Sequence, residues 1–304
     1  MDIGLNYAFG SSRSHDPGFL RMLVQTMEDL GFSSLWMPEH VVSFPTESYS
    51  SKYPYSEDGS VPWQGNLHLH DPLLVAAAAA QHTSTLRFGS GIVILPQRPP
   101  LLTAKELMTL DHLTGGRFEF GIGGGWSAEE YAALGVPFSQ RGRRFDEYIG
   151  AIRSAWASQP ASFKGEFISY SDVIIAPPPL TPGGPKMLVG GSSAAAMRRA
   201  ARLGDGWFGH WTDAADPGAE IDALAQALES ADRDRQDGFL IKVSLVHTGG
   251  PDQLPARLNE LSALGVDELV LVVPVRSRTL ESDLRLWSQA ADLRSQDNNR
   301  RDYQ

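Results

Sequence analysis

The chain has 304 residues, a formal net charge of −10 and no cysteine. This length fits one closed α/β barrel, and the 42% hydrophobic and 20% charged fractions are those of a globular protein. The acidic balance argues against a nucleic-acid-binding face, and the lack of cysteine excludes disulfides, thiol nucleophiles and thiolate metal sites. No apolar run approaches the roughly 20 residues that span a bilayer, and the N-terminus does not read as a signal peptide. We therefore expect a cytoplasmic protein without a membrane segment.

Short apolar or β-branched runs alternate with amphipathic stretches along almost the whole chain. Eight strands, each followed by a helix, predict a single (β/α)8 TIM barrel. A doubly wound sheet is the alternative, but the first strand lacks a glycine-rich turn into its helix. The predicted strands are Ile3–Tyr7, Ser34–Met37, Leu86–Leu95, Phe118–Ile122, Met187–Val189, Gly206–Gly209, Leu240–His247 and Glu268–Val273. The predicted helices are Gly18–Leu30, Pro72–Thr83, Leu101–Leu113, Arg143–Ala157, Ala194–Leu203, Ala219–Ala231, Gln253–Leu264 and Leu280–Leu293.

Three helix ends carry capping signals. Asp71 precedes Pro72, which predicts an N-cap before a proline in the first turn. Gly31 and Gly204 each follow a leucine at a helix end, which predicts left-handed C-caps.

Two long segments interrupt the repeat. Val41–His70 follows the second strand, and Gln159–Pro185 comes after the fourth strand and its helix. Long insertions at the C-terminal ends of barrel strands form the substrate side, so we expect both insertions to be walls or lids of the active site. The barrel domain is expected to span residues 1–294, followed by a polar tail, Ser295–Gln304.

His40 directly follows the second predicted strand, where catalytic groups of a barrel concentrate. A neutral imidazole there could exchange a proton near pH 7. A loop histidine that only hydrogen-bonds the backbone is the alternative.

Two glycine-containing segments follow later strands. Gly121–Trp126 would let the backbone approach a ligand, although a tight turn explains the glycines equally well. The segment from Val189 to Ser193 leads from a strand into a helix, which is the arrangement of a phosphate-binding turn. Ser192 and Ser193 could also cap that helix.

His68 and His70 resemble the paired histidines of metal-dependent barrel hydrolases. Such a site needs further ligands at later strand ends, and only His210 is suitably placed. Asp71 is better explained as the helix cap. We therefore predict no metal site, and assign His68, His70, His210 and Phe44 to the substrate pocket.

Several spaced blocks occur in an order that resembles the luciferase-like monooxygenase superfamily over nearly the whole chain. More narrowly, the sequence resembles its actinobacterial branch of coenzyme F-420 (deazaflavin)-dependent oxidoreductases. The matching blocks are Glu28–Trp36, Pro38–Val41, Leu86–Ile92, Leu110–Arg117, Gly121–Trp126, Leu134–Phe138, Val189–Ser192 and Ala200–Trp207.

The resemblance implies a ring cofactor at the C-terminal mouth of the barrel, with His40 beside the reactive ring carbon. It also implies a bulge in the third strand, often with a non-prolyl cis peptide, and the matching dipeptide is Gly91-Ile92. The implied cofactor contacts are His40, Gly91, Ile92, Gly123, Gly124, Gly125 and Trp126 around the ring and its chain, and Val189, Gly190, Gly191 and Ser192 at the phosphate.

One position departs from the family pattern. Related sugar-phosphate dehydrogenases carry a catalytic glutamate where this chain has Trp126, so sugar-phosphate oxidation is not expected and Trp126 is interpreted as an apolar wall. Glu129 and Glu130 follow and are interpreted as solvent-facing. Arginines for an exit groove that binds the polyglutamate tail of the deazaflavin would come from Arg98, Arg141, Arg143 and Arg144.

The resemblance implies hydride transfer between reduced coenzyme F-420 and an electron-poor C=C, C=N or C=O group of a small organic substrate, with His40 handling the proton. An FMN-dependent monooxygenase is the first alternative. A metal-dependent hydrolase and a cofactor-binding protein without turnover remain as others. The sequence leaves a homodimer open and does not identify the substrate.

Overall fold

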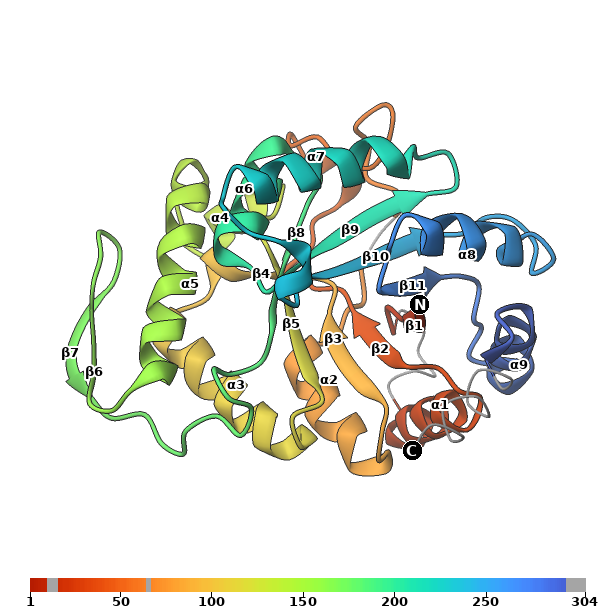
Figure 1. Cartoon of the computed structure of the whole chain (residues 1–304), viewed down its shortest axis with the longest axis horizontal. Helices are drawn as coiled ribbons and strands as arrows, with labels where there is room; N and C mark the ends of the chain where they lie inside the picture. The colour runs from red at the N-terminus through yellow and green to blue at the C-terminus, as the bar shows by residue number, and fades with distance from the viewer. Residues whose placement is uncertain (10–15, 64–66, 294–304) are drawn as a thin grey trace.

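The computed structural model describes residues 1–9, 16–63 and 67–293. The expected polar tail, Ser295–Gln304, lies outside this part. The main sheet runs in the order β3-β2-β1-β11-β10-β9-β8-β5-β4, and an additional β3–β5 pairing closes it into a barrel (Figure 1). The barrel prediction is confirmed and the doubly wound sheet is excluded.

The boundaries follow the predicted elements within a few residues. The barrel strands are β1 (Asp2–Asn6), β2 (Ser34–Met37), β3 (Arg87–Ser90), β4 (Val93–Ile94), β5 (Phe118–Gly123), β8 (Met187–Gly190), β9 (Gly206–Thr212), β10 (Leu240–Val246) and β11 (Glu268–Val272). A separate hairpin consists of β6 (Ala161–Lys164) and β7 (Ser169–Val173). The α-helices are α1 (Pro17–Asp29), α2 (Pro72–Ala79), α3 (Pro100–Thr114), α4 (Ala128–Ala133), α5 (Arg141–Ala157), α6 (Ala194–Leu203), α7 (Pro217–Glu229), α8 (Leu254–Ala263) and α9 (Leu280–Ala290). The short 3-10 turns are η2 (Thr46–Ser48), η3 (Ala80–His82), η4 (Leu95–Gln97), η5 (Phe138–Gln140) and η6 (Arg235–Asp237).

Two of the three predicted caps are confirmed. The Asp71 side chain accepts from the backbone N–H groups of Leu73 and Leu74, and Gly31 has a φ of 84° after α1. Gly204 does not form the predicted left-handed cap, because its φ is −91°. It must be small for another reason: a Cβ there would lie 2.8 Å from the Ala200 carbonyl oxygen. Among the described residues, no helix is long and apolar enough to cross a membrane.

The third barrel strand is interrupted at Gly91-Ile92. The sequence predicts one strand over Leu86–Leu95, whereas β3 and β4 lie on either side of this dipeptide and each pairs with β5. The Gly91-Ile92 peptide bond is cis, as the resemblance implies. Because two residues leave the ladder here, the strand bulges near the C-terminal end of the barrel.

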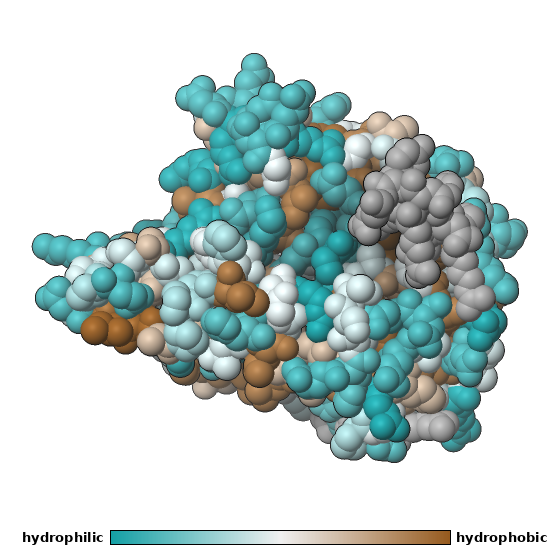
Figure 2. Space-filling view, turned by 60° about the horizontal axis from the view of Figure 1, so that its bottom comes forward, coloured by the Kyte–Doolittle hydropathy of each residue, from teal (hydrophilic) through white to brown (hydrophobic). Residues whose placement is uncertain are grey.

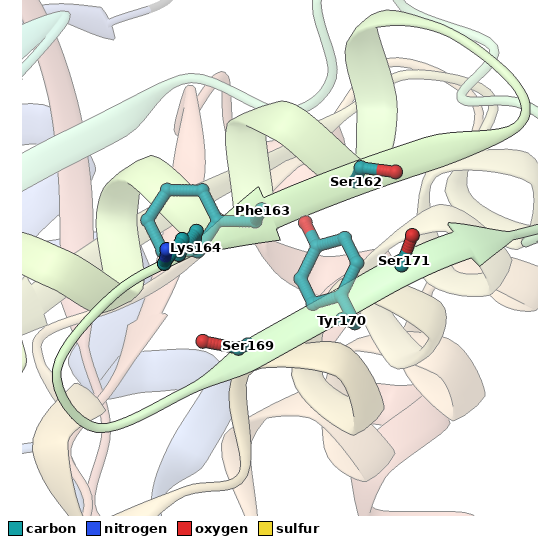
Figure 3. A pocket seen from close by; sticks show the side chains of 6 residues that line it. All are labelled: Ser162, Phe163, Lys164, Ser169, Tyr170 and Ser171. Carbon is teal, nitrogen blue, oxygen red and sulfur yellow. The ribbon is translucent and has the colours of Figure 1, made fainter.

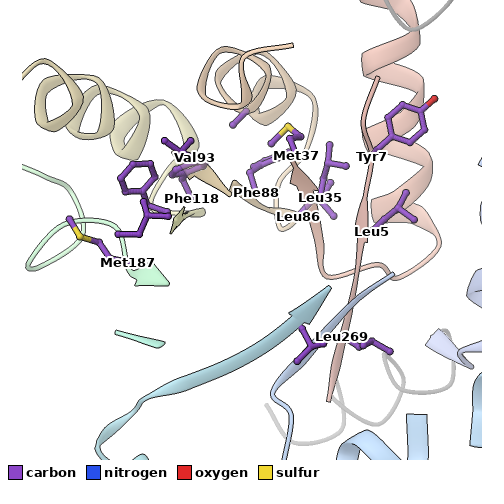
Figure 4. Close-up of a cluster of buried hydrophobic side chains, with 14 of the residues drawn as sticks. Leu5, Tyr7, Leu35, Met37, Leu86, Phe88, Val93, Phe118, Met187 and Leu269 are labelled. Carbon is purple, nitrogen blue, oxygen red and sulfur yellow. The ribbon is translucent and has the colours of Figure 1, made fainter. Parts of the chain in front are cut away.

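Strand residues alternate between a helix-facing layer and the barrel interior. Leu5, Leu35, Phe88 and Phe118 belong to the buried layer between strands and helices (Figure 4). This layer is continuous from the first strand to the last, so one hydrophobic core holds the helices around the barrel.

The barrel interior is filled at its centre. Trp36 and Phe208 stack with their ring centroids 4.6 Å apart, and Leu188 and Val270 complete a buried cluster with them. A Cβ on Gly89 would lie 2.4 Å from the Trp36 ring, so only glycine fits beside it. Because the centre is packed, a ligand can bind only at an end of the barrel.

The N-terminal end of the interior holds a buried ionic cluster, which we call the floor. Lys242 Nζ donates to Glu268 Oε2 at 2.5 Å and also to Glu119. The Glu268 carboxylate accepts from the Ser34 hydroxyl and lies 3.0 Å from Arg87 Nη2. Each charge is therefore compensated, as burial of ions requires. The floor consists of Ser34, Arg87, Glu119, Lys242 and Glu268.

The second insertion packs along α5 and not over the barrel mouth, so the prediction that Gln159–Pro185 forms a wall or lid of the active site is wrong. It begins after α5 and leads into β8, and therefore joins a helix to the N-terminal end of a strand. Its β6–β7 hairpin runs along the outer side of α5, where Glu147 accepts from the backbone N–H groups of Glu166, Phe167 and Ile168. The hairpin projects to the left in Figures 1 and 2.

We predict that Lys242→Met lowers the free energy of unfolding by about 3–5 kcal/mol, because it leaves the buried Glu268 carboxylate without its nearest cation. Urea unfolding at pH 7 measures the change. Lys186→Met, at an exposed position, is the matched control and should be close to neutral. Equal stability of the two variants would contradict a structural role for the floor.

The same site predicts how stability depends on pH. Burial alone raises the pKa of Glu268, but the charges of Lys242 and Arg87 have the larger opposite effect. The net result lowers the pKa from 4.5 to about 2. Because the folded pKa is depressed, the stabilisation is present above the unfolded value and is lost as the pH falls toward about 2. Unfolding between pH 5 and pH 2, about the range of this titration, should show a steeper acid loss for the wild type than for Glu268→Gln.

Candidate active site

His40 lies just beyond β2, at the C-terminal end of the barrel, and pairs with a buried glutamate. Its Nδ1 is 2.9 Å from Glu130 Oε2, while Glu130 Oε1 accepts from the backbone N–H of Val41 at 2.7 Å. The His40 side chain is 16% exposed and that of Glu130 is 1% exposed. An ionised carboxylate can only accept, so Nδ1 donates and Nε2 is the ring nitrogen left for a ligand.

Glu130 was expected to face solvent, and this is wrong. It lies on α4, a helix of six residues that the sequence analysis did not predict. Ser127 caps α4 by accepting from the Glu130 N–H, and the Ser-x-x-Glu spacing is that of a capping box. The Glu130 side chain turns toward His40 instead of closing the box. The spacing therefore indicates where the helix starts, but it does not indicate that Glu130 pairs with His40, 90 residues away.

Aromatic side chains of the first insertion, together with Trp126 from the turn after β5, pack around His40. The Trp63 ring lies 5.7 Å from the imidazole and the Trp126 ring 5.9 Å, measured between centroids. Tyr53 contacts both tryptophans, at 5.5 Å and 5.3 Å, and Tyr49 lies 5.4 Å from Trp126. We call Tyr49, Tyr53, Trp63 and Trp126 the aromatic cluster. Burial raises the pKa of Tyr53 to about 12, so its hydroxyl stays protonated at neutral pH.

A second carboxylate anchors the insertion to α4. Glu129 Oε1 accepts from the backbone N–H groups of Ser50 and Ser51 and from the Ser50 hydroxyl. Burial raises the pKa of Glu129, but the hydrogen bonds together lower it more, to well below its usual range. The two adjacent glutamates thus divide their roles: Glu130 holds His40, and Glu129 holds the loop that carries three of the four members of the aromatic cluster.

The predicted substrate-pocket residues separate into two groups. Phe44 lies 5.7 Å from the Tyr49 ring and its N–H donates to the Tyr49 hydroxyl, so it borders the aromatic cluster. His210, on β9, lies 4.6 Å from the Tyr55 ring, and burial lowers its pKa, so it is neutral at pH 7.

His68 and His70 lie toward the start of α2. His68 is exposed, and the half-buried His70 ring lies 5.6 Å from Phe9. Neither ring has a contact with the aromatic cluster among the described ring pairs. Within the described part of the chain, no group of three or more histidines and carboxylates could hold a metal ion.

The glycines of the two predicted cofactor segments surround the bulge. A Cβ on Gly123 would lie 2.5 Å from the Ile92 side chain, and a Cβ on Gly190 would lie 3.0 Å from it. Gly125 has a φ of 63° and faces Ile94. Gly124 has more space, with its nearest neighbour, Phe145, at 3.8 Å. Most of these glycines therefore make room for the bulge itself.

The turn after β8 contains both predicted serines, but they differ in role. Ser193 caps α6 by accepting from the Ala196 N–H. The exposed Ser192 donates to Glu220 Oε2 at 2.9 Å, and Trp211 Nε1 donates to the same oxygen. Gly191, with a φ of 110°, needs to be glycine, while the preceding Val189 is fully buried. A phosphate at Ser192 would have to displace the Glu220 carboxylate from the hydroxyl.

The mouth also contains polar side chains that the sequence analysis missed. Ser244 lies two residues beyond Lys242 on β10 and faces the same interior, nearer the C-terminal end. It is 2% exposed, and its hydroxyl has no hydrogen-bond partner among the described residues. Asn6, the last residue of β1, has its side-chain amide close to Gly91 of the bulge. A buried hydroxyl without a partner fits a polar ligand seated on this end of the barrel.

Arg98, the first arginine proposed for an exit groove, is engaged inside the protein. It contacts the buried Glu39 carboxylate and lies 2.7 Å from Asp71. Arg143 pairs with Glu166 of the hairpin. Arg98 therefore does not contribute to a basic groove on the surface.

Two further features lie away from His40. At the end of β10, His247 Nδ1 is 2.9 Å from Asp213, and Nε2 is 3.2 Å from the Gly250 carbonyl oxygen, so both ring nitrogens are used within the loop. A surface hollow on the hairpin is lined by Ser162, Phe163, Lys164, Ser169, Tyr170 and Ser171 (Figure 3). It is remote from the aromatic cluster, and its lining carries one charged side chain.

We predict that Glu129→Ala loosens the 41–63 loop and leaves the barrel unchanged. Charge-assisted hydrogen bonds contribute about 1.5–3 kcal/mol, so amide exchange at Ser50 and Ser51 should accelerate by about tenfold or more. Hydrogen–deuterium exchange with mass spectrometry measures the rates. Glu147→Ala is the matched control, because it should accelerate exchange only in the hairpin. Unchanged exchange in the 41–63 loop would show that Glu129 is not its anchor.

Comparisons with known proteins agree with this architecture. The family model described as luciferase-like monooxygenase matches residues 4–261. An uncharacterized protein of Mycobacterium tuberculosis is 30% identical over 269 residues, which cover 88% of this chain and 91% of that protein. The FMNH2-dependent dimethylsulfone monooxygenase of Pseudomonas putida is 33% identical over 158 residues, 51% of this chain and 43% of that protein. The structure of coenzyme F-420-dependent tetrahydromethanopterin reductase from Methanopyrus kandleri matches with a TM-score of 0.71 at 16% identity, covering 95% of this chain and 97% of that chain. The chain therefore belongs to the luciferase-like monooxygenase family.

Proposed function

We propose that the chain is a coenzyme F-420-dependent oxidoreductase that reduces an electron-poor C=C, C=N or C=O group of a small organic substrate. The observation that carries the proposal is the His40–Glu130 pair, a fixed proton-handling group at the barrel mouth. The sequence blocks of the F-420-dependent branch support it. So does the fold shared with a reductase that uses this coenzyme.

The cofactor ring would lie on the bulge at Gly91-Ile92. Ser244 would donate to it from the barrel interior, and the backbone around Gly124 would flank the chain that follows the ring. The phosphate would be held by Gly190, Gly191 and Ser192. The buried Val189 would anchor the start of this turn in the core. When bound, the reduced deazaflavin supplies the hydride, and the protein supplies position, a proton and exclusion of water.

His40 would serve the substrate through Nε2. Glu130 accepts a hydrogen bond from Nδ1–H, so the neutral ring presents Nε2 as a base and the protonated ring presents it as an acid. The same carboxylate would stabilise the imidazolium when Nε2 gains a proton. Because Glu130 also accepts from Val41, its orientation does not depend on His40 alone.

The aromatic cluster would exclude water from the reacting face. Trp126 and Trp63 flank the imidazole, and Phe44 borders the cluster on its outer side. His210 would line the opposite part of the pocket as a neutral hydrogen-bonding group. A dry surface strengthens the interaction of His40 with a developing charge on the substrate.

An FMN-dependent monooxygenase is the second candidate, and one observation favours it. The polyglutamate tail of coenzyme F-420 needs cations, and two of the four candidate arginines are already paired with carboxylates: Arg98 with Glu39 and Asp71, and Arg143 with Glu166. FMN has no such tail. The relative from Pseudomonas putida, whose description names FMNH2, also supports this alternative.

Titration with the two cofactors separates these candidates. We predict that coenzyme F-420 binds at low micromolar concentration or tighter, and that FMN binds at least about tenfold more weakly, a difference of roughly 1.4 kcal/mol. Fluorescence of each cofactor measures the affinity. Ser192→Ala should weaken binding of whichever cofactor is held. Tighter FMN binding, accompanied by oxygen consumption, would favour the monooxygenase.

Substitution at His40 tests the proton-handling role. We predict that His40→Ala slows single-turnover hydride transfer by about 10²–10⁴-fold, the usual contribution of a positioned acid or base. Cofactor affinity should change far less. Glu130→Gln keeps an acceptor for Nδ1 and should lose less rate than Glu130→Leu. A His40→Ala enzyme that transfers hydride at the wild-type rate would remove His40 from the mechanism.

A further inference from the structure

Trp63 carries a buried polar atom that nothing in the fold uses. Its indole Nε1 is shielded from solvent, yet it has no acceptor within the described part of the chain. The indole N–H of Trp36 donates to Ser34, that of Trp156 to Ala104 and that of Trp207 to Gly191. A buried donor without an acceptor costs free energy, about 1–3 kcal/mol, so the position of Trp63 calls for an acceptor that arrives from outside.

The ring of Trp63 lies where a substrate would bind. Its centroid is 5.7 Å from that of His40 and 5.5 Å from that of Tyr53. The Trp63 and His40 rings are therefore neighbours in the part of the site where the proposed reaction would take place. Trp63 is also fixed from its backbone side, where the Thr46 hydroxyl donates to the Trp63 carbonyl oxygen.

The surroundings limit the charge of that group. The cation–π pairs of the described residues all involve rings outside the aromatic cluster, such as Phe138 under Arg141. Glu129 and Glu130 place two carboxylates beside the cluster instead. An anionic substrate would be repelled by these carboxylates, whereas a neutral acceptor would not.

We propose that Trp63 is a substrate-binding residue whose indole N–H donates to the oxygen of a neutral, flat, conjugated carbonyl compound held by the aromatic cluster. This inference rests on the proposed function, which makes the bound compound the group that is reduced. A carbonyl oxygen bound by Trp63 would place the conjugated carbons beside His40, which would handle the proton. The flat shape follows from the four aromatic side chains, which favour stacking against a planar substrate. The carbonyl follows from the donor at Nε1.

Three compounds with the same phenyl-propenyl skeleton test the proposal. They are 4-phenyl-3-buten-2-one, which is neutral with a carbonyl; 1-phenyl-1-butene, which lacks the acceptor; and cinnamate, which is anionic. Calorimetric titration measures their affinity for the full chain, both with its cofactor and without it. We expect the ketone to bind about three- to tenfold more tightly than the hydrocarbon, the range of one neutral hydrogen bond, and cinnamate to bind most weakly.

Trp63→Phe keeps an aromatic ring and removes the donor. It should abolish the preference for the ketone while leaving the affinity for the hydrocarbon unchanged. Trp156→Phe makes the same change on α5, away from the mouth, and should retain the preference. In the ¹H–¹⁵N spectrum, the indole signal lost in Trp63→Phe should shift on addition of the ketone but much less on addition of the hydrocarbon.

Wild-type protein that binds ketone and hydrocarbon equally would overturn the proposal, even if Trp63→Phe failed to fold. A preference for the ketone that survives in Trp63→Phe would also overturn the proposal. So would tighter binding of cinnamate than of the ketone. The titration without cofactor does not depend on hydride transfer, so it tests substrate binding by Trp63 alone. Failure of the proposed function would instead appear in the cofactor titration.

Discussion

The packed barrel interior determines where this protein can bind anything. Trp36 and Phe208 stack across the centre, over a floor in which Lys242 and Glu268 neutralise each other. This packing requires glycine at position 89, because a side chain there would overlap the Trp36 ring. With the centre closed, the interior accepts ligands only above Phe208, where the bulge and the strand ends meet. The site is thus a consequence of how the barrel is filled, and the loops only complete it.

The fold was largely predictable because it depends on local patterns. Short apolar or β-branched runs locate the strands, and Asp71 and Gly31 mark helix ends through their own side-chain or backbone preferences. Gly204 shows the limit of such reasoning: it follows a helix, as a left-handed cap would, but it is glycine because the Ala200 carbonyl is too close for a Cβ. The hairpin inside Gln159–Pro185 shows another limit. The length of the insertion and the rule for long barrel insertions suggested a wall or lid, whereas its place between a helix end and a strand start puts it on the outer side of α5.

The site was predictable only in part, and the missing part is specific. His40 could be chosen because it follows a strand, and Gly91-Ile92 because the family pattern names it. Glu130 could not be chosen, because its role depends on a contact across 90 residues of chain. Ser244 could not be recognised either, since a serine in a strand is unremarkable until its hydroxyl is found buried without a partner. Partners and missing partners are both properties of the folded chain.

Buried polar side chains differ between the two ends of the barrel. At the floor, Lys242, Glu268 and Ser34 contact one another, and their chemistry is complete without a ligand. At the mouth, the Ser244 hydroxyl and the Trp63 indole N–H are buried yet lack acceptors among the residues that the structure describes. A fold gains nothing from such groups by itself, because burying them unpaired costs free energy. Arg87 Nε at the floor is also buried without a partner among the described residues, but Arg87 is ion-paired through its other nitrogens. The two groups at the mouth have no other polar atom in their side chains, and they lie beside a histidine whose Nδ1 is already held by Glu130. This is the pattern expected where a ligand supplies the missing bonds. The polarity of the mouth is therefore better explained by what binds there than by what holds the chain together.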